Sequence, residues 1–280
     1  GLGDVYKRQI LCRRFNPVIP ILNVFMNNRD HRKITVVDGR VGFTGGYNLA
    51  EEYFNRTHPY GQWKDSGIRL EGDAVRGLTL IFLELWGATQ KAAPEVERYL
   101  PDVPYTAREN AVVLPYADNP LDDEATGENV YLNMIRSAKD YVYITTPYLI
   151  LSDEMQRTLR LAASSGVDVR IITPGIPDKK LVFRLTRSYY VPLLRAGVKI
   201  YEYTPGFLHA KCYVSDDHVA VVGSINMDYR SMFLHFECGV LLLQNSQVLT
   251  LRDDVRRTLY QCREVQCADC RTGLVGTVLD

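Results

Sequence analysis

The 280-residue sequence predicts an α/β fold made of two homologous halves, each a mixed β-sheet flanked by helices. Two observations predict this fold. A long pattern of polar residues and glycines occurs twice with identical spacing, in residues 31–48 and 209–226. In the second half, apolar strand-like runs alternate with helical segments in the order of a βαβ unit, which implies a parallel pair of strands in a covered sheet.

Composition places the chain among globular proteins. Apolar residues make up 46% of the sequence and aromatic residues 10%, which is typical of a chain that buries a core. The formal net charge is zero, so no global positive field attracts nucleic acid, although a local basic patch is compatible with this balance. No run of 18 apolar residues occurs, the length that a membrane-crossing helix needs.

The repeated pattern contains reactive side chains as well as apolar ones. The first copy reads His31-x-Lys33-x4-Asp38-x6-Gly45-Gly46-x-Asn48, and the second reads His209-x-Lys211-x4-Asp216-x6-Gly223-Ser224-x-Asn226. The alignment continues downstream, where WKDSGIRL (63–70) lies over HFECGVLL (235–242) and Asp65 stands opposite Glu237. A repeat that served packing alone would keep apolar positions, whereas this one also keeps His, Lys and Asn.

Predicted elements follow each other in a regular order. The first copy begins on a strand over 33–38. An amphipathic helix follows each copy, over 73–90 with Val75, Leu78, Phe82 and Leu85 on one face, and over 247–262 with Val248, Leu251, Val255 and Leu259 on one face. Further helices are predicted over 127–139, 153–164 with Ser152 as N-cap, and 180–195. Further strands are predicted over 141–147, 167–174, 198–203, 210–215 and 219–222.

The halves are predicted to occupy residues 1–100 and 111–280, joined by a proline-containing linker over 101–110. About 88 residues (111–198) precede the strand that leads into the second copy. The equivalent strand of the first half is expected at roughly 10–15, with almost nothing before it. We therefore expect the chain to be a fragment of a longer protein, with an incomplete first half. A naturally shortened half is the alternative, and it would leave a sheet edge uncovered.

The first copy on its own suits an anion. His31 and Lys33 are two residues apart on a strand, so their side chains point the same way. Asn48 follows a Gly-Gly turn, where backbone can approach a ligand closely, and its amide donates hydrogen bonds without adding charge. Such a cluster fits the non-bridging oxygens of a phosphodiester. A single copy would be a weak signal, because a His at the start of a strand is more often only a hydrogen-bonded polar residue.

Two copies supply both groups that phosphodiester cleavage requires, a nucleophile and an acid for the leaving oxygen. Either His31 or His209 attacks phosphorus and forms a phosphohistidine, and the other protonates the leaving group. The Lys and Asn side chains of both copies stabilise charge on the equatorial oxygens: Lys33, Lys211, Asn48 and Asn226. Asp65 and Glu237 are expected to orient the two imidazoles through their second nitrogens.

The remaining candidates receive structural interpretations. Asp38 and Asp216 complete the two motifs, and at strand ends they are expected to tie turns rather than to contact phosphate. The three other histidines are interpreted as non-catalytic: His58, His218 and His235.

No metal and no other cofactor is expected. Cys267 and Cys270 form one CxxC near Cys262, without a second pair, which favours reduced thiols over a zinc site.

The two patterns resemble the paired HKD motifs of the phospholipase D superfamily, and the wider sequence resembles bacterial cardiolipin synthases over nearly all of residues 10–280. Four stretches carry the resemblance: residues 27–53 (NNRDHRKITVVDGRVGFTGGYNLAEEY), 146–155 (TPYLILSDEM), 165–180 (SGVDVRIITPGIPDKK) and 206–237 (GFLHAKCYVSDDHVAVVGSINMDYRSMFLHFE). Members of this type usually begin with membrane-spanning helices, which this sequence does not contain.

The resemblance implies a pseudo-twofold fold in which both histidines meet at the interface of the halves. It implies transfer of a phosphatidyl group from one phosphatidylglycerol to another with release of glycerol, and it points to His31 as nucleophile and His209 as acid. It also implies a phospholipid substrate, no nucleic acid, and a place at the bacterial cell membrane, cytosol-facing or peripheral.

Three functions remain open from the residues alone: a phosphatidyltransferase, a phosphodiester hydrolase acting on lipid or nucleic acid, and a non-catalytic binding relic. Two intact motifs argue against the relic. Zero net charge disfavours the nuclease, because proteins that follow phosphate backbones usually carry a basic surface. Alcohol or water as acceptor separates transferase from lipase, and only the resemblance favours the transferase.

Overall fold

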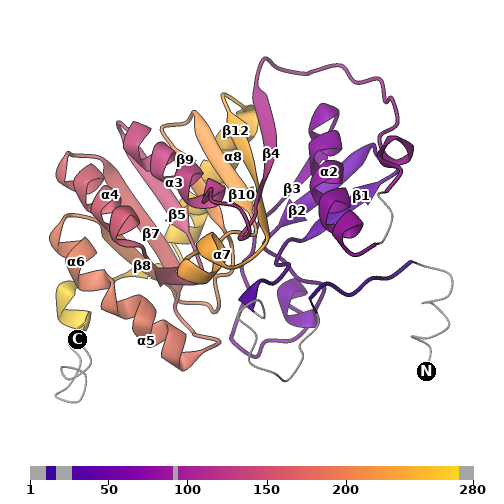
Figure 1. Ribbon diagram of the computed structural model, residues 1–280. Helices are drawn as coiled ribbons and strands as arrows, with labels where there is room; N and C mark the ends of the chain where they lie inside the picture. The colour runs from indigo at the N-terminus through magenta and orange to yellow at the C-terminus, as the bar shows by residue number, and fades with distance from the viewer. Residues whose placement is uncertain (1–10, 17–26, 91–93, 271–280) are drawn as a thin grey trace.

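The computed structural model describes residues 11–16, 27–90 and 94–270 (Figure 1). Within these ranges the chain forms an α/β structure with a three-stranded sheet, an eight-stranded sheet and a two-stranded pairing of β6 with β11. The predicted α/β class is therefore confirmed. No helix of the described ranges is long and apolar enough to cross a membrane.

The three-stranded sheet contains the first motif. Its antiparallel strands are β1 (Ile34–Val37), β2 (Val41–Gly45) and β3 (Gly67–Glu71), and the 3-10 helix η2 (Glu51–Phe54) lies between the last two. The helix α2 (Asp73–Ala88) buries Val75 and Leu78 against this sheet. Phe82, predicted on the same face, is instead 43% exposed, because the buried stripe turns toward Ile81 and Leu85.

The eight-stranded sheet is mixed, with the order β13-β8-β7-β5-β9-β10-β12-β4. Its parallel centre is β5, β7 and β8, and β9 joins β5 antiparallel. The strands are β4 (Val112–Asp118), β5 (Tyr141–Thr145), β7 (Asp168–Pro174), β8 (Lys199–Tyr203), β9 (Cys212–Ser215), β10 (Val219–Gly223), β12 (Glu237–Leu243) and β13 (Cys262–Glu264), and the short pair is β6 (Leu149–Ile150) with β11 (Met227–Asp228).

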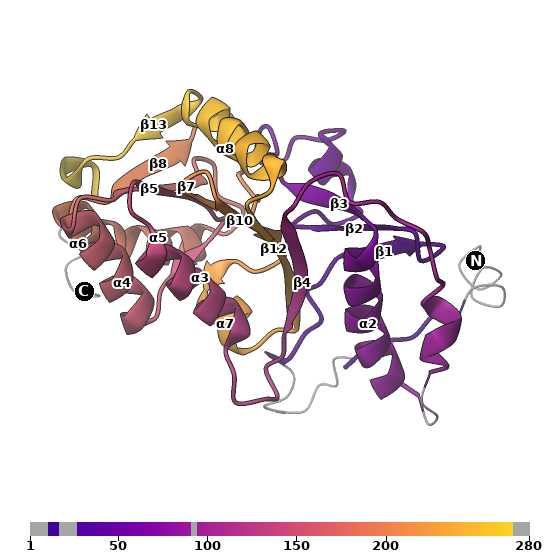
Figure 2. The same ribbon diagram turned by 90° about the horizontal axis from the view of Figure 1, so that it is seen from above.

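Helices cover both faces of this sheet (Figure 2). One face carries α3 (Thr126–Ser137), α4 (Asp153–Ser164) and α6 (Tyr190–Arg195), and the other carries α8 (Ser246–Leu259). The remaining short helices are α5 (Lys180–Ser188), α7 (Tyr229–Phe233), η3 (Val96–Tyr99) and η4 (Cys267–Cys270). Alternate side chains of one strand enter the two cores, so Ile171 packs with α4 and α6, while Ile172 packs on the α8 side.

The two sheets share a core. Leu70 and Leu78 of the first sheet unit belong to the same buried cluster as Val222 and Val240 of the large sheet. The α2 helix also packs beside the edge strand β4 (Figure 2). At this contact Gly77 faces Pro115. This shared core fixes the first motif relative to the second.

Several predicted boundaries are confirmed and three are wrong. Ser152 caps α4 as predicted, its hydroxyl accepting from the Met155 backbone N–H at 3.1 Å. The predicted helix 180–195 is broken at Tyr189, because Pro192 has no N–H to donate to the Ser188 carbonyl. The predicted helix 247–262 ends at Leu259, before β13. Residues 11–15 form no strand, and residue 10 lies outside the described residues.

Candidate active site

The first motif histidine is held by the second half of the chain. His31 lies just before β1, and its backbone N–H donates to the Phe236 carbonyl at 2.9 Å. Its Nδ1 lies 2.8 Å from Oε1 and 3.0 Å from Oε2 of Glu237, the first residue of β12. The Glu237 side chain is fully buried, whereas that of His31 is 25% exposed. The Glu237 carboxylate therefore fixes the orientation of the imidazole, and part of the His31 ring stays accessible to a substrate.

The second motif histidine is held by the first half in an equivalent way. The backbone N–H of His209 donates to the Lys64 carbonyl at 2.7 Å. The Nδ1 atom of His209 lies 2.8 Å from Oδ2 of Asp65. Each carboxylate therefore pairs with the histidine of the other copy, rather than with the histidine of its own copy.

Both motif lysines bend back onto their own histidine. Lys33 Nζ donates to the His31 carbonyl at 2.5 Å, and Lys211 Nζ donates to the His209 carbonyl at 2.5 Å. Lys211 Nζ also lies 2.7 Å from Nδ1 and 3.0 Å from Nε2 of His209. Burial lowers the pKa of Lys33, and it lowers the pKa of the fully buried Lys211 to about 7. An ammonium at either position is therefore short of solvation and suited to an anionic ligand.

Charges within the site keep the carboxylates ionised. Burial alone would raise the pKa of Glu237, but His31, the nearby His235 imidazole and the Ser224 hydroxyl outweigh it and lower that pKa to about 2. Burial is likewise outweighed at Asp65, where Lys211 and His209 hold the pKa below its usual value. Burial and the Lys211 charge lower the pKa of His209 to about 3. His209 is therefore a neutral imidazole that donates from Nδ1 to Asp65 and keeps a lone pair on Nε2.

Close backbone approach explains the glycine at position 46. A Cβ there would lie 2.3 Å from Oδ1 of Asp65 and 3.0 Å from Cδ of Lys211. The second copy has Ser224 at this position, and its hydroxyl donates to Oε2 of Glu237 at 2.5 Å. The sequence analysis did not predict this contact of Ser224. The available signal was that the second copy has Gly-Ser where the first has Gly-Gly.

The two motif asparagines have different surroundings. Asn226 is 6% exposed, and its Oδ1 has no hydrogen-bond partner among the described residues. Asn48 is exposed, and its Nδ2 donates to the Tyr53 hydroxyl at 2.6 Å. The two asparagine side chains therefore differ in burial and in hydrogen bonding, although the spacing of the two motifs is identical.

The motif aspartates lie at the far ends of their strands from the histidines. Asp216 has φ of 50°, and its carboxylate accepts from three consecutive backbone N–H groups, those of Lys139, Asp140 and Tyr141, at 2.7–3.1 Å. Asp38 has φ of 53° in the turn between β1 and β2. Both positions are turns of the kind in which Asp tolerates left-handed backbone.

Aromatic rings that the sequence analysis did not single out surround His209. Its ring centroid lies 5.2 Å from that of Tyr53, 5.3 Å from that of Trp63 and 5.9 Å from that of Phe207. Beside His31, the ring of His235 lies at 5.5 Å. Trp63 and His235 occupy equivalent positions in the repeat, each two residues before its carboxylate. This equivalence was the sequence signal that could have placed both rings next to the motif histidines.

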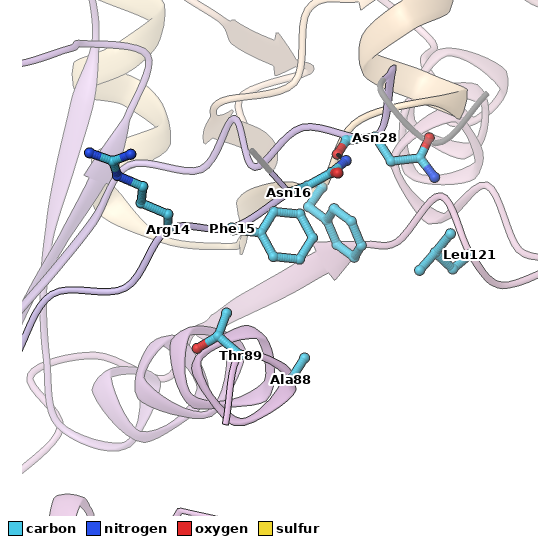
Figure 3. Close-up of a pocket in the computed structure, with 8 residues that line it drawn as sticks. Arg14, Phe15, Asn16, Asn28, Ala88, Thr89 and Leu121 are labelled. Carbon is cyan, nitrogen blue, oxygen red and sulfur yellow. Dashed lines mark hydrogen bonds between the residues drawn. The ribbon is translucent and has the colours of Figure 1, made fainter. Parts of the chain in front are cut away.

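The motif residues do not line the surface pocket shown in Figure 3. This pocket of about 370 Å³ lies between the end of α2 and the segment 14–16, with Phe236 in its wall. Phe15 meets Phe236 edge-on at 5.2 Å. Because the pocket contains no group of either motif, we assign it no part in the chemistry.

Potential metal ligands gather at one place in the described part of the chain. One ligand atom each of His31, His235 and Glu237 lies within 4.8 Å of the others. Cys267 and Cys270 are free thiols.

Comparison with known proteins gives sequence and structural relatives. Residues 131–259 match the family model described as "Cardiolipin synthase, PLD-like domain". The chain is 41% identical over 253 residues to a cardiolipin synthase of Halalkalibacterium halodurans, covering 90% of this chain and 50% of that protein. It is 40% identical over 252 residues to cardiolipin synthase 2 of Bacillus cereus, covering 90% and 49%. An uncharacterized protein of Streptococcus mutans is 48% identical over 275 residues, covering 96% and 59%.

A solved structure shares the fold. Phosphatidylserine synthase of Haemophilus influenzae superposes with a TM-score of 0.66 at 13% identity, covering 89% of this chain and 67% of that one. The chain spans about half the length of the cardiolipin synthases it matches.

Proposed function

Since the chain belongs to the phospholipase D superfamily and is similar to bacterial cardiolipin synthases, we propose that it is a phosphatidyltransferase of membrane lipids. The reaction moves a phosphatidyl group from one phosphatidylglycerol to another and releases glycerol. The observation that carries this proposal is the pair of crossed His–carboxylate contacts, His31 with Glu237 and His209 with Asp65. The site then acts at the surface of the bacterial membrane, where its lipid substrate lies.

In the first step, Nε2 of His31 attacks phosphorus and the bond from phosphorus to the glycerol oxygen breaks. Glu237 accepts the Nδ1 proton in a hydrogen bond and stabilises the positive ring that forms. His209 donates a proton to the departing oxygen, so that glycerol leaves as a neutral alcohol. The product of this step is a phosphatidyl group bound to His31.

In the second step, a glycerol hydroxyl of the other phosphatidylglycerol attacks phosphorus. His209 accepts the hydroxyl proton, the bond between phosphorus and His31 breaks, and cardiolipin forms. His209 thereby returns to its protonated form for the next cycle. Water in place of the alcohol would give phosphatidic acid from the same intermediate.

Substrate binding allows His209 to take up from solvent the proton that the first step requires. The charge of Lys211 is one cause of the low pKa of His209. A phosphodiester anion placed between Lys33 and Lys211 offsets that charge and raises the pKa of the imidazole. The same two ammonium groups, with the amides of Asn48 and Asn226, then stabilise the negative oxygens of the transition state.

A substrate whose leaving group needs no protonation separates the role of the nucleophile from that of the acid. With a p-nitrophenyl phosphodiester, His209→Asn keeps an initial burst of nitrophenol, because nitrophenolate leaves without a proton. His31→Asn gives no burst, because no covalent intermediate forms. A burst from His31→Asn that is absent in His209→Asn would reverse the assignment.

Product analysis tests the transfer itself. The purified chain is mixed with phosphatidylglycerol vesicles, and cardiolipin, phosphatidic acid and glycerol are measured. Cardiolipin with equimolar glycerol supports the transferase, whereas phosphatidic acid with equimolar glycerol and no cardiolipin shows a hydrolase. The exposed His218→Asn is the control and should retain the wild-type rate.

A further inference from the structure

His31, His235 and Glu237 have the ligand types and spacing of a metal site. One ligand atom of each lies within 4.8 Å of the others, and Glu237 is fully buried. We propose that this cluster binds a zinc-class divalent cation, and that the ion reversibly blocks the site. Binding requires only these three side chains, while the effect on turnover rests on the proposed function.

His235 is the member that the reaction leaves without a role. Its side chain is 13% exposed, and neither ring nitrogen has a hydrogen-bond partner among the described residues. Its Nδ1 lies 3.7 Å from Oε1 of Glu237, beyond hydrogen-bond distance. Buried polar atoms are nearly always paired, so Nδ1 of His235, next to the Glu237 carboxylate, is available as a ligand to a cation that both groups would bind.

Among the described residues, the His209–Asp65 pair has no equivalent third ligand. The position of His235 is taken by Trp63, whose ring lies 5.3 Å from His209, much as His235 lies 5.5 Å from His31. An indole N–H donates a hydrogen bond but offers no lone pair to a metal. The repeat therefore has two His–carboxylate pairs and a third ligand beside only one of them.

The spacing fits tetrahedral coordination. Bonds of about 2.0–2.1 Å place two ligand atoms roughly 3.4 Å apart. The observed separations from Oε1 of Glu237 bracket this value, at 2.8 Å to Nδ1 of His31 and 3.7 Å to Nδ1 of His235. Two imidazoles and one carboxylate leave the fourth position for water or a phosphate oxygen, and imidazole ligands favour zinc over magnesium or calcium.

A cation at this position removes the nucleophile. Coordination uses the lone pair on Nδ1 of His31, so the ring proton resides on Nε2. The Nε2 atom then has no lone pair with which to attack phosphorus. The ion also occupies the carboxylate of Glu237, which otherwise stabilises the positive ring.

Cobalt(II) is the probe for binding, because its absorption reports the ligands. The expected result for the metal-free chain is one equivalent of Co²⁺ with visible d–d bands and no thiolate charge-transfer band. His235→Asn should lose at least 10-fold in affinity, and His218→Asn should bind as the wild type does. Equal binding by His235→Asn, or a spectrum with only thiolate charge transfer from the cysteines, would overturn the site.

Zinc titration of turnover tests the block. We expect Zn²⁺ to inhibit the wild-type chain at concentrations at least 10-fold lower than those that inhibit His235→Asn, each relative to its own metal-free rate. Equal inhibition of the two would overturn the blocking role. If the metal-free wild type forms no cardiolipin, the proposed function fails, and the cobalt spectra still decide whether the metal site exists.

Discussion

Glu237 lies 2.8 Å from the imidazole of His31, although 206 residues separate them in the chain. Asp65 and His209 are related in the same way across 144 residues, also at 2.8 Å. Neither histidine is oriented by its own copy of the motif. The site therefore exists only when the three-stranded sheet is packed against β12, and loss of that contact would disable both histidines together.

Removing the charge of Glu237 tests this dependence. Glu237→Gln keeps the side-chain volume but no longer stabilises a positive His31 ring, and it can present an amide N–H to Nδ1. We expect turnover of phosphatidylglycerol to fall by about 100- to 10,000-fold, as when a buried carboxylate is removed from a catalytic triad. Circular dichroism should show an unchanged fold. A rate within threefold of the wild type would contradict a role for Glu237 in orienting His31.

Gly46 tests the close contact between the copies. Its added Cβ in Gly46→Ala meets Asp65 Oδ1 at 2.3 Å, so Asp65 and the neighbouring backbone have to move. We expect a loss of about 1–3 kcal/mol in the free energy of unfolding, with reduced turnover. Gly77→Ala in α2 is the matched control, since its Cβ would meet Pro115 of β4 at ordinary contact distances of 3.6 Å or more. Urea denaturation that shows equal stabilities for both variants would contradict the clash.

Asp216 tests whether the third motif residue serves structure. Asp216→Ala leaves the backbone N–H groups of Lys139, Asp140 and Tyr141 without their acceptor. We expect the free energy of unfolding to fall by about 1–3 kcal/mol. The rate per folded molecule should stay within about threefold, because the carboxylate lies at the far end of β9. A large fall in rate without loss of stability would instead place Asp216 in the chemistry.

Local sequence patterns predicted most helices and strands. They could not predict contacts between segments that are distant in the sequence. The strand β5 and the capped helix α4 followed from apolar runs and Ser152, because these signals act within a few residues. The break before Tyr190 was not predicted, although Pro192 lacks the N–H that a continuous helix would need there. The crossed carboxylates could not be derived, because spacing within one copy says nothing of which partner lies across the interface. His235 was set aside for the same reason, since its neighbour His31 lies in the other sheet.

Between pH 6.5 and 4.5, two buried groups should change the stability of the fold in opposite directions. His209 lowers it as the pH falls, whereas Asp118 raises it, because burial raises the pKa of that carboxyl to about 7. The pKa of His209 is about 3 in the folded chain and 6.5 in the unfolded one, so between these values only the unfolded state takes up the proton. The contribution of His209 to stability is therefore complete above pH 6.5 and falls as the pH is lowered, by up to about 3 kcal/mol at pH 4.5. The lowered pKa values of Asp65 and Glu237 act in the same direction but only near and below pH 4. Urea denaturation at pH 6.5 and 4.5 isolates the His209 contribution by comparison of variants. On going from pH 6.5 to 4.5, wild type and His218→Asn should each change in stability less favourably than His209→Asn, by up to about 3 kcal/mol. An equal pH difference in His209→Asn would show that the buried imidazole is not the group that the unfolded chain protonates.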